Sequence, residues 1–329
     1  MTMLYRPILR QAWKITWRNK FLWFFGFFVA LWGNSGAYEL IFSTPERLSW
    51  QKDFWLSLQN SLTAGSFLIF LKSLPGLISQ VDSLTLLIIL ILGSLIILLF
   101  LIWLSVISIG AIIQAVTQIN KRRQITFHAA MRSGRQVWGR ILSIFILAKL
   151  AIGLLFVFLS LYLIYFTPRS ETIGLTFALV TTVVFIAFSL IVYFLAIYAV
   201  NSVVLEKTHL VEAIYRGWST FRRAPLISLE MALLLLLINL ALAIVLLLIG
   251  TIVILPLLQL FDVFILINFV TVFYVFFFLI TLTLLALFIL LSAGFAVFQL
   301  ACWTTLYQEI NKGRAFSKVR RLVHGLPKI

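Results

Sequence analysis

The segment Tyr5-Arg-Pro-Ile-Leu-Arg-Gln-Ala-Trp-Lys-Ile-Thr-Trp-Arg-Asn-Lys-Phe21 sets the pattern on which the rest of the chain is built. At 3.6 residues per turn its apolar side chains share one stripe, made of Tyr5, Ile8, Leu9, Ala12, Trp13, Trp17 and Phe21. The other face carries Arg6, Arg10, Gln11, Lys14 and Arg18. A basic face opposite an aromatic one is typical of a helix that lies flat on an anionic membrane surface. We therefore predict an interfacial helix that leads directly into an apolar segment, 21–32.

The composition of the whole chain agrees with a membrane location. Hydrophobic residues make up 63% and charged residues 11% of the 329 residues, whereas soluble domains have about half and about a quarter. Because basic residues of membrane proteins collect in cytoplasmic loops, the net charge of +16 is not interpreted as a nucleic-acid signal. The single cysteine, Cys302, excludes an internal disulfide, and no Cys/His spacing suggests a metal site. We expect no cofactor.

The apolar runs predict an all-α, polytopic transmembrane helical bundle in a single integral membrane domain. Six spans are expected, at about 21–41, 84–113, 141–166, 172–204, 226–255 and 264–300. Pro256 and Asp262 mark the turn between the last two. The final charge-free run, 263–308, is long enough for two crossings but has no turn signal in its middle, so one long helix is predicted there.

The distribution of basic residues fixes the expected orientation. With six spans, 21 of the 26 Lys and Arg residues lie on the side of both termini, including six in a basic tail, 312–328. Four lie on the other side, and Lys149 lies within a span. A seventh crossing would move the tail charges outside. The sequence therefore predicts a multi-pass protein of the cell (inner) membrane with both termini cytoplasmic.

Two later stretches repeat the opening segment and align with it without gaps. The aligned positions are Leu9, Met131 and Ile214; Ala12, Gly134 and Gly217; Trp13, Arg135 and Trp218; and Arg18, Arg140 and Arg223. Each stretch precedes an outward span and a returning one, so a threefold repeat is predicted over about 1–120, 121–205 and 206–329. Basic amphipathic interfacial helices then precede spans 1, 3 and 5. Convergence of any juxtamembrane helix on small, aromatic and arginine positions is the alternative.

The segment after the first helix also has features of a secretory signal. Its apolar core, 21–32, is followed by Ser35-Gly-Ala37, which fits a small-x-small cleavage site. The preceding basic region is long and amphipathic, however, and resembles internal segments that cannot be signals. We therefore expect the first span to be retained.

The stretches Ala12–Gly26 and Gly217–Pro225 carry a family resemblance. They resemble a set of uncharacterised bacterial membrane proteins that are similar to the membrane domain of some glycerophosphodiester phosphodiesterases. The resemblance implies a six-helix inner-membrane domain of unassigned activity. This chain has no room for a soluble phosphodiesterase domain, so that activity is not carried over.

Few residues are candidates for a catalytic or ligand-binding role. No phosphate loop, nucleophile elbow or metal-ligand spacing is present, and the protein is expected not to be an enzyme. Lys149 and Glu230 lie within predicted spans, where charged groups are costly and often functional. They form a possible intramembrane ion pair; the alternative is that Lys149 snorkels and Glu230 sits at headgroup level.

Two functions compete. The first is a non-enzymatic protein that engages lipid or partner proteins at the cytoplasmic membrane face. Its possible contacts with anionic headgroups are Arg10, Lys14, Arg18, Arg132, Arg135, Arg140, Arg216, Arg222 and Arg223. The alternative is a transporter or permease component with a central polar pathway near Lys149 and Glu230. The identity of any protein partner is not predicted.

Overall fold

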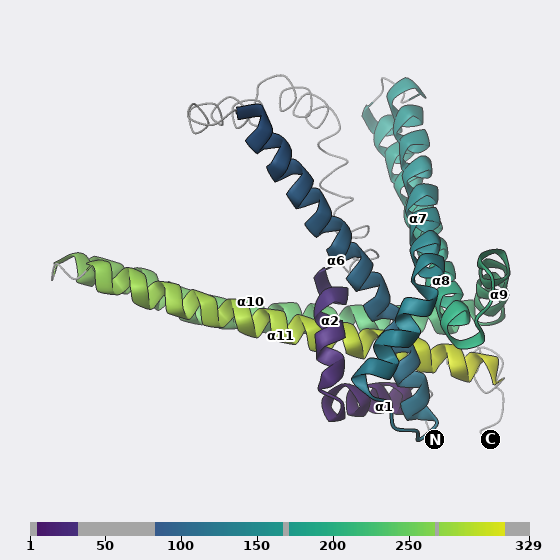
Figure 1. Cartoon of the computed structure of the whole chain (residues 1–329). Helices are drawn as coiled ribbons and strands as arrows, with labels where there is room; N and C mark the ends of the chain where they lie inside the picture. Colours follow the sequence, from purple (N-terminus) through teal and green to yellow (C-terminus); the bar gives the residue numbers. More distant parts are fainter. Residues whose placement is uncertain (1–4, 32–82, 167–170, 267–269, 313–329) are drawn as a thin grey trace. The chain divides into compact units, whose positions relative to one another are not determined.

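A computed structural model describes residues 5–31, 83–166, 171–266 and 270–312, and every element in these ranges is an α-helix (Figure 1). In order they are α1 (Tyr5–Arg18), α2 (Phe21–Leu31), α6 (Ser83–Asn120), α7 (Phe127–Phe166), α8 (Glu171–Glu206), α9 (Leu210–Arg223), α10 (Pro225–Leu266) and α11 (Val270–Asn311). The predicted all-α class is confirmed.

Five of these helices are long and apolar enough to cross a bilayer. The crossing segments are Ile88–Asn120, Phe127–Tyr162, Thr176–Glu206, Pro225–Leu257 and Val275–Asn311. The chain is therefore a multi-pass membrane protein. The first predicted span is described only as α2, an apolar helix of 11 residues, because its remainder to residue 41 lies outside the described residues. A sixth crossing stays a prediction, as does the basic tail after residue 312.

Two helix boundaries differ from the sequence-based expectation. The second amphipathic stretch and the third span form one helix, α7, because no proline interrupts 127–166. The turn expected at Pro256 is also absent, since α10 continues to Leu266 with Pro256 inside it. A proline removes one backbone hydrogen bond, and long membrane helices packed against a neighbour tolerate this loss. Here α10 packs against α11.

The chain divides into two compact units. Unit 1 comprises residues 1–33, 105–144 and 194–329, and it contains α1, α2, α9, α10 and α11 entirely. Within it, α1 and α2 both pack on α11, and α9 contacts α10 and α11. The closest approach is at Gly26 of α2, where an added Cβ would lie 2.2 Å from the carbonyl oxygen of Ala293. Only glycine allows the two helix backbones to approach this closely.

Unit 2 comprises residues 34–104 and 145–193. Its described parts are segments of α6, α7 and α8, each of about 22 residues, which corresponds to about 33 Å of helix and to the thickness of a hydrocarbon core. Rings pair between α7 and α8: Phe156 with Phe185 at 5.8 Å and Tyr162 with Phe177 at 5.1 Å. Most of the exposed side chains in these segments are leucine, isoleucine, valine and phenylalanine, as expected of a lipid-facing surface.

Candidate membrane-lipid interface

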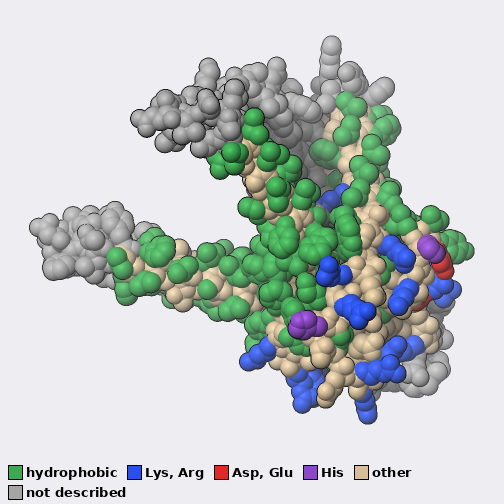
Figure 2. Space-filling view, in the orientation of Figure 1, with side chains coloured by type: hydrophobic (Ala, Val, Ile, Leu, Met, Phe, Trp, Pro, Cys, Tyr) green, Lys and Arg blue, Asp and Glu red, His purple; other side chains and the backbone are tan. Residues whose placement is uncertain are grey.

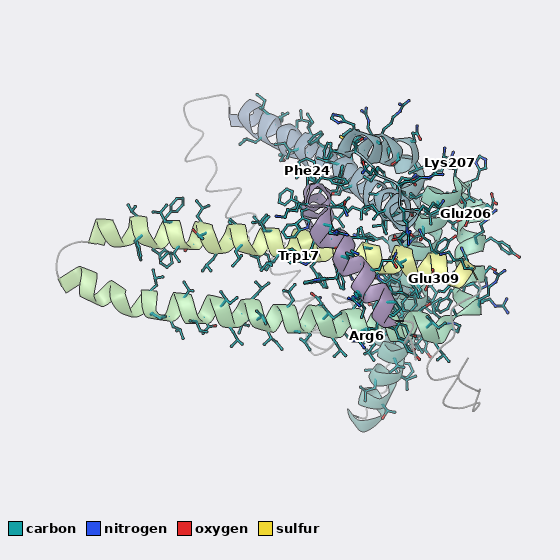
Figure 3. All side chains as sticks on the ribbon, turned by 90° about the horizontal axis from the view of Figure 1, so that it is seen from below. Arg6, Trp17, Phe24, Glu206, Lys207 and Glu309 are labelled. Atoms are coloured by element: carbon teal, nitrogen blue, oxygen red, sulfur yellow. The ribbon has the colours of Figure 1, made fainter. Side chains whose placement is uncertain are left out.

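Helix α1 has three distinct sides. Tyr5, Ile8, Ala12 and Ile15 are buried. A second side exposes two tryptophans, Trp13 at 57% and Trp17 at 45%, and a third exposes the basic side chains Arg6, Arg10, Lys14 and Arg18. Figure 3 shows α1 crossing α11 obliquely, with Arg6 near the start of α1 and Trp17 near its end. Because the buried side chains hold α1 against α11, the tryptophan and basic sides are left on the surface.

Helix α9 has the same three-sided arrangement. Ala213, Gly217 and Thr220 are buried, and an added Cβ at Gly217 would lie 2.9 Å from the carbonyl oxygen of Leu195 in α8. Another side exposes Val211 (79%), Tyr215 (73%) and Trp218 (41%) at spacings of four and three residues. The remaining side is charged, and it carries Glu212, Arg216 and Arg223.

The equivalent stretch of α7, residues 127–144, packs in a similar way. Gly134 is buried against α6, and an added Cβ there would lie 2.3 Å from the carbonyl oxygen of Ile107. Arg132, Arg135 and Trp138 are exposed. In all three stretches, therefore, a small residue at the aligned position is buried: Ala12, Gly134 or Gly217.

Arg140 and Arg216, which are two of the nine predicted headgroup contacts, bind specific groups of the protein itself. The Arg140 guanidinium donates to the carbonyl oxygens of Lys207 at 3.0 Å and Thr208 at 3.3 Å, directly after α8 ends at Glu206. Arg216 forms ion pairs with Glu206 and with Glu212. The other seven have exposed side chains; they are Arg10, Lys14, Arg18, Arg132, Arg135, Arg222 and Arg223. In Figure 2, blue Lys and Arg side chains gather at the end of unit 1 that carries α1 and α9, and hydrophobic side chains cover the α10–α11 arm.

The described residues give Glu230 a partner that the sequence does not indicate. The Tyr5 hydroxyl of α1 donates a hydrogen bond to the Glu230 carboxylate of α10. Burial of the Tyr5 hydroxyl and, after it, this hydrogen bond raise the pKa of Tyr5 well above its usual range. No local pattern could link residues 225 positions apart. Lys149 belongs to unit 2 and is exposed, and its pairing with Glu230 in unit 1 stays a prediction.

A second group of polar side chains joins α1, α6 and α11. The Asn120 side-chain oxygen accepts from Gln11 at 2.7 Å, and its amide donates to Gln308 at 3.0 Å and to Thr305 at 3.3 Å. The Gln308 amide in turn donates to the Thr117 hydroxyl at 2.9 Å. These bonds satisfy polar groups at the ends of apolar helices and fix the rotation of α6 and α11 about their axes.

Helices α8 and α11 are joined by aromatic and polar contacts. The ring of Tyr198 lies 6.3 Å from Trp303 and 6.1 Å from Tyr307, and the Tyr198 hydroxyl lies 2.6 Å from the Ser228 hydroxyl of α10. The Tyr307 hydroxyl donates to Glu206 at 2.9 Å. Glu206 thus connects the buried aromatic residues to the surface ion pair with Arg216.

Among the residues that the structure describes, no group of three or more His, Cys, Asp or Glu side chains is placed to hold a metal ion. Compared with models of protein families, with curated proteins and with solved structures, the chain gives no match. The resemblance to the membrane domain of glycerophosphodiester phosphodiesterases stays a prediction. What the geometry defines is a multi-pass helical membrane protein whose unit 1 carries a basic and aromatic surface.

Proposed function

We propose that the chain is a six-span, non-enzymatic protein of the inner membrane, with both termini cytoplasmic, that engages anionic phospholipid or partner proteins through its basic surface. The single observation that carries the proposal is that arginine and lysine side chains are exposed on all three surface stretches, α1, residues 127–144 of α7, and α9. Each Lys or Arg close to an anionic leaflet contributes about 1 kcal/mol to attraction. Lipid is the first partner to test, because these helices connect directly to apolar spans.

The packing within unit 1 supports the proposed internal repeat. Residues 127–144 pack on α6, and α9 packs on α8, so each of these surface stretches lies against the helix that returns just before it in the chain. The first stretch, α1, packs on α11, with the Trp13 and Phe298 rings 6.1 Å apart. In each of the three copies the surface stretch thus packs against a long helix of unit 1. The packing also supports retention of the first span, since Leu22, Phe25 and Val29 of α2 are buried.

The lipid proposal is tested by removing the basic side of α1. In Arg10→Gln/Lys14→Gln/Arg18→Gln protein, native mass spectrometry should find less retained phosphatidylglycerol, and phosphatidylglycerol should raise the Tm less than it does for the wild type. Arg216→Gln is the matched control, because Glu206 and Glu212 already neutralise Arg216. Equal phosphatidylglycerol retention in the triple variant and the wild type would contradict the proposal.

The proposed orientation has a separate test. Single cysteines at Arg18 and Arg140 should both react with a membrane-impermeant maleimide only when the cytoplasmic face is opened. Labelling from opposite faces would overturn the six-span scheme and the repeat together.

A further inference from the structure

The exposed apolar side of α9 is formed by Val211, Tyr215 and Trp218. Val211 and Tyr215 are among the most exposed large apolar side chains of the described residues, at 79% and 73%. They cannot turn inward, because the opposite side of α9 is held against α8 through Gly217. Contiguous exposed apolar groups at helical spacing mark a contact surface.

The connection between α9 and α10 fixes how far this surface lies from the membrane. Only Ala224 separates Arg223, the last residue of α9, from Pro225, the first of α10. The last charged residue before the hydrophobic part of α10 is Glu230, and an uncharged run continues from Met231 to Phe261. At 1.5 Å per residue, the end of α9 therefore lies within about 12 Å of the hydrocarbon core. The headgroup layer is about 5–8 Å thick, and a helix with its side chains about 10–12 Å wide, so α9 reaches the layer.

The residue types on α9 are those expected of a helix at the headgroup layer. Tyrosine and tryptophan prefer the boundary between headgroups and acyl chains, because the ring is apolar and its polar group reaches water. The helix that follows, α10, also exposes apolar side chains from its first turns, since Leu226, Leu229 and Leu233 are 43%, 50% and 56% exposed. The charged side of α9 holds its own ion pair between Arg216 and Glu212 at 2.7 Å, which is suited to water rather than to lipid.

We propose that α9 is embedded in the cytoplasmic leaflet, with Val211, Tyr215 and Trp218 against the glycerol and upper acyl region of phospholipids. The occupant of this surface is the bilayer itself and not a second protein. The inference rests on the proposed cytoplasmic location of the surface stretches, but it depends on apolar burial and not on the basic side chains that the proposed function uses.

The single buried cysteine makes a direct depth measurement possible. In a Cys302→Ala background, Val211→Cys and Glu212→Cys proteins are labelled with an environment-sensitive nitrobenzoxadiazole group. Each is reconstituted into vesicles of phosphatidylcholine alone and of phosphatidylcholine with phosphatidylglycerol. Glu212 is the matched control, because it is the next residue along α9 and lies on the charged side.

The expected result is a blue-shifted label at Val211 that is quenched by lipid carrying a doxyl group near the glycerol end and protected from iodide. The label at Glu212 should show the opposite pattern. Equal iodide quenching at both positions would overturn the proposal, and so would protection of Val211 from iodide and doxyl lipid alike, since a protein would then cover it. Tyr215→Cys repeats the measurement if Val211→Cys does not yield folded protein.

The two vesicle compositions separate this inference from the proposed function. Lipid quenching at Val211 in both compositions, without any preference for phosphatidylglycerol in mass spectrometry, would uphold the embedded helix and contradict the anionic-lipid function. A preference for phosphatidylglycerol in mass spectrometry, together with iodide quenching at Val211, would uphold the anionic-lipid function and contradict the embedded helix.

Discussion

The two halves of α11 have the same apolar character but opposite surroundings. From Val275 to Ser292 no residue is buried, whereas from Ala293 to Ile310 nearly all are, the exceptions being Phe295, Gln308 and Glu309. The exposed half is mostly Leu, Phe and Ile with one alanine, whereas the packed half has three alanines, a glycine and buried polar groups, among them Gln299, Thr304 and Thr305. Apolar character alone thus makes a helix insert, and small and polar side chains decide which part of it packs against protein.

The largest effect is expected from placing a branched side chain where two helices touch. Gly26→Val puts a Cβ 2.2 Å from the Ala293 carbonyl oxygen and should separate α2 from α11, at a cost above the about 1–3 kcal/mol typical of overpacking. Gly250→Val in the exposed part of α10 meets nothing within 4 Å and should assemble normally. Size-exclusion profiles and Tm in detergent measure both. Equal size-exclusion profiles and Tm values for the two variants would mean that the surface packed against protein and the exposed apolar surface do not differ in their tolerance of a larger side chain.

A cavity in the packed half of α11 should have the next largest effect. Leu306 is fully buried, so Leu306→Ala should lower stability by about 2–5 kcal/mol. Leu282 is 50% exposed in the other half, and its truncation should change little, because lipid or detergent fills the space that the side chain leaves. Denaturation by sodium dodecyl sulfate compares the two. A similar loss in both would mean that Leu282 also packs against protein.

Removal of a polar contact should have a smaller effect. Asn120→Ala removes the bonds to Gln11, Thr305 and Gln308 and should cost about 1–3 kcal/mol. Ser94→Ala is the matched control, because the Ser94 hydroxyl donates to the Ile91 carbonyl oxygen of its own helix, at 2.9 Å. The loss at Asn120 should persist in Gln11→Ala protein if the bonds to α11 dominate. An unchanged Tm for Asn120→Ala would show that the polar group contributes nothing to packing.

The smallest effect is expected at Tyr5 and depends on pH. Tyr5→Phe removes the hydrogen bond to Glu230, which contributes about 1 kcal/mol. Since folding raises the pKa of Tyr5 above its ordinary value of 10.0, this stability is fully present below pH 10 and is lost at higher pH, where only the unfolded tyrosine ionises. The difference in Tm between wild type and variant should therefore narrow above pH 10. Tyr215→Phe, which leaves the Tyr5–Glu230 hydrogen bond in place, is the control for the loss of a tyrosine hydroxyl.

The candidate interface was only partly predictable. The basic positions of α1, α7 and α9 follow from helical periodicity, and all of the nine except Arg140 are exposed. The use of Arg140 to hold the carbonyl oxygens of Lys207 and Thr208 was not predictable, because it joins positions 67 and 68 residues apart. The continuity of α7 was missed for a local reason: a change from amphipathic to apolar composition does not by itself break a helix.

By itself, the sequence determined that the chain is helical and membrane-spanning, because long apolar segments can satisfy their backbone hydrogen bonds in lipid only as helices. It also determined where the charges lie along each helix, since the 3.6-residue period fixes the faces. Only the tertiary structure decided that α1 packs on α11 and that Tyr5 reaches Glu230. Such contacts depend on the close fit of small residues between distant helices, and no local pattern of side chains specifies which helices meet.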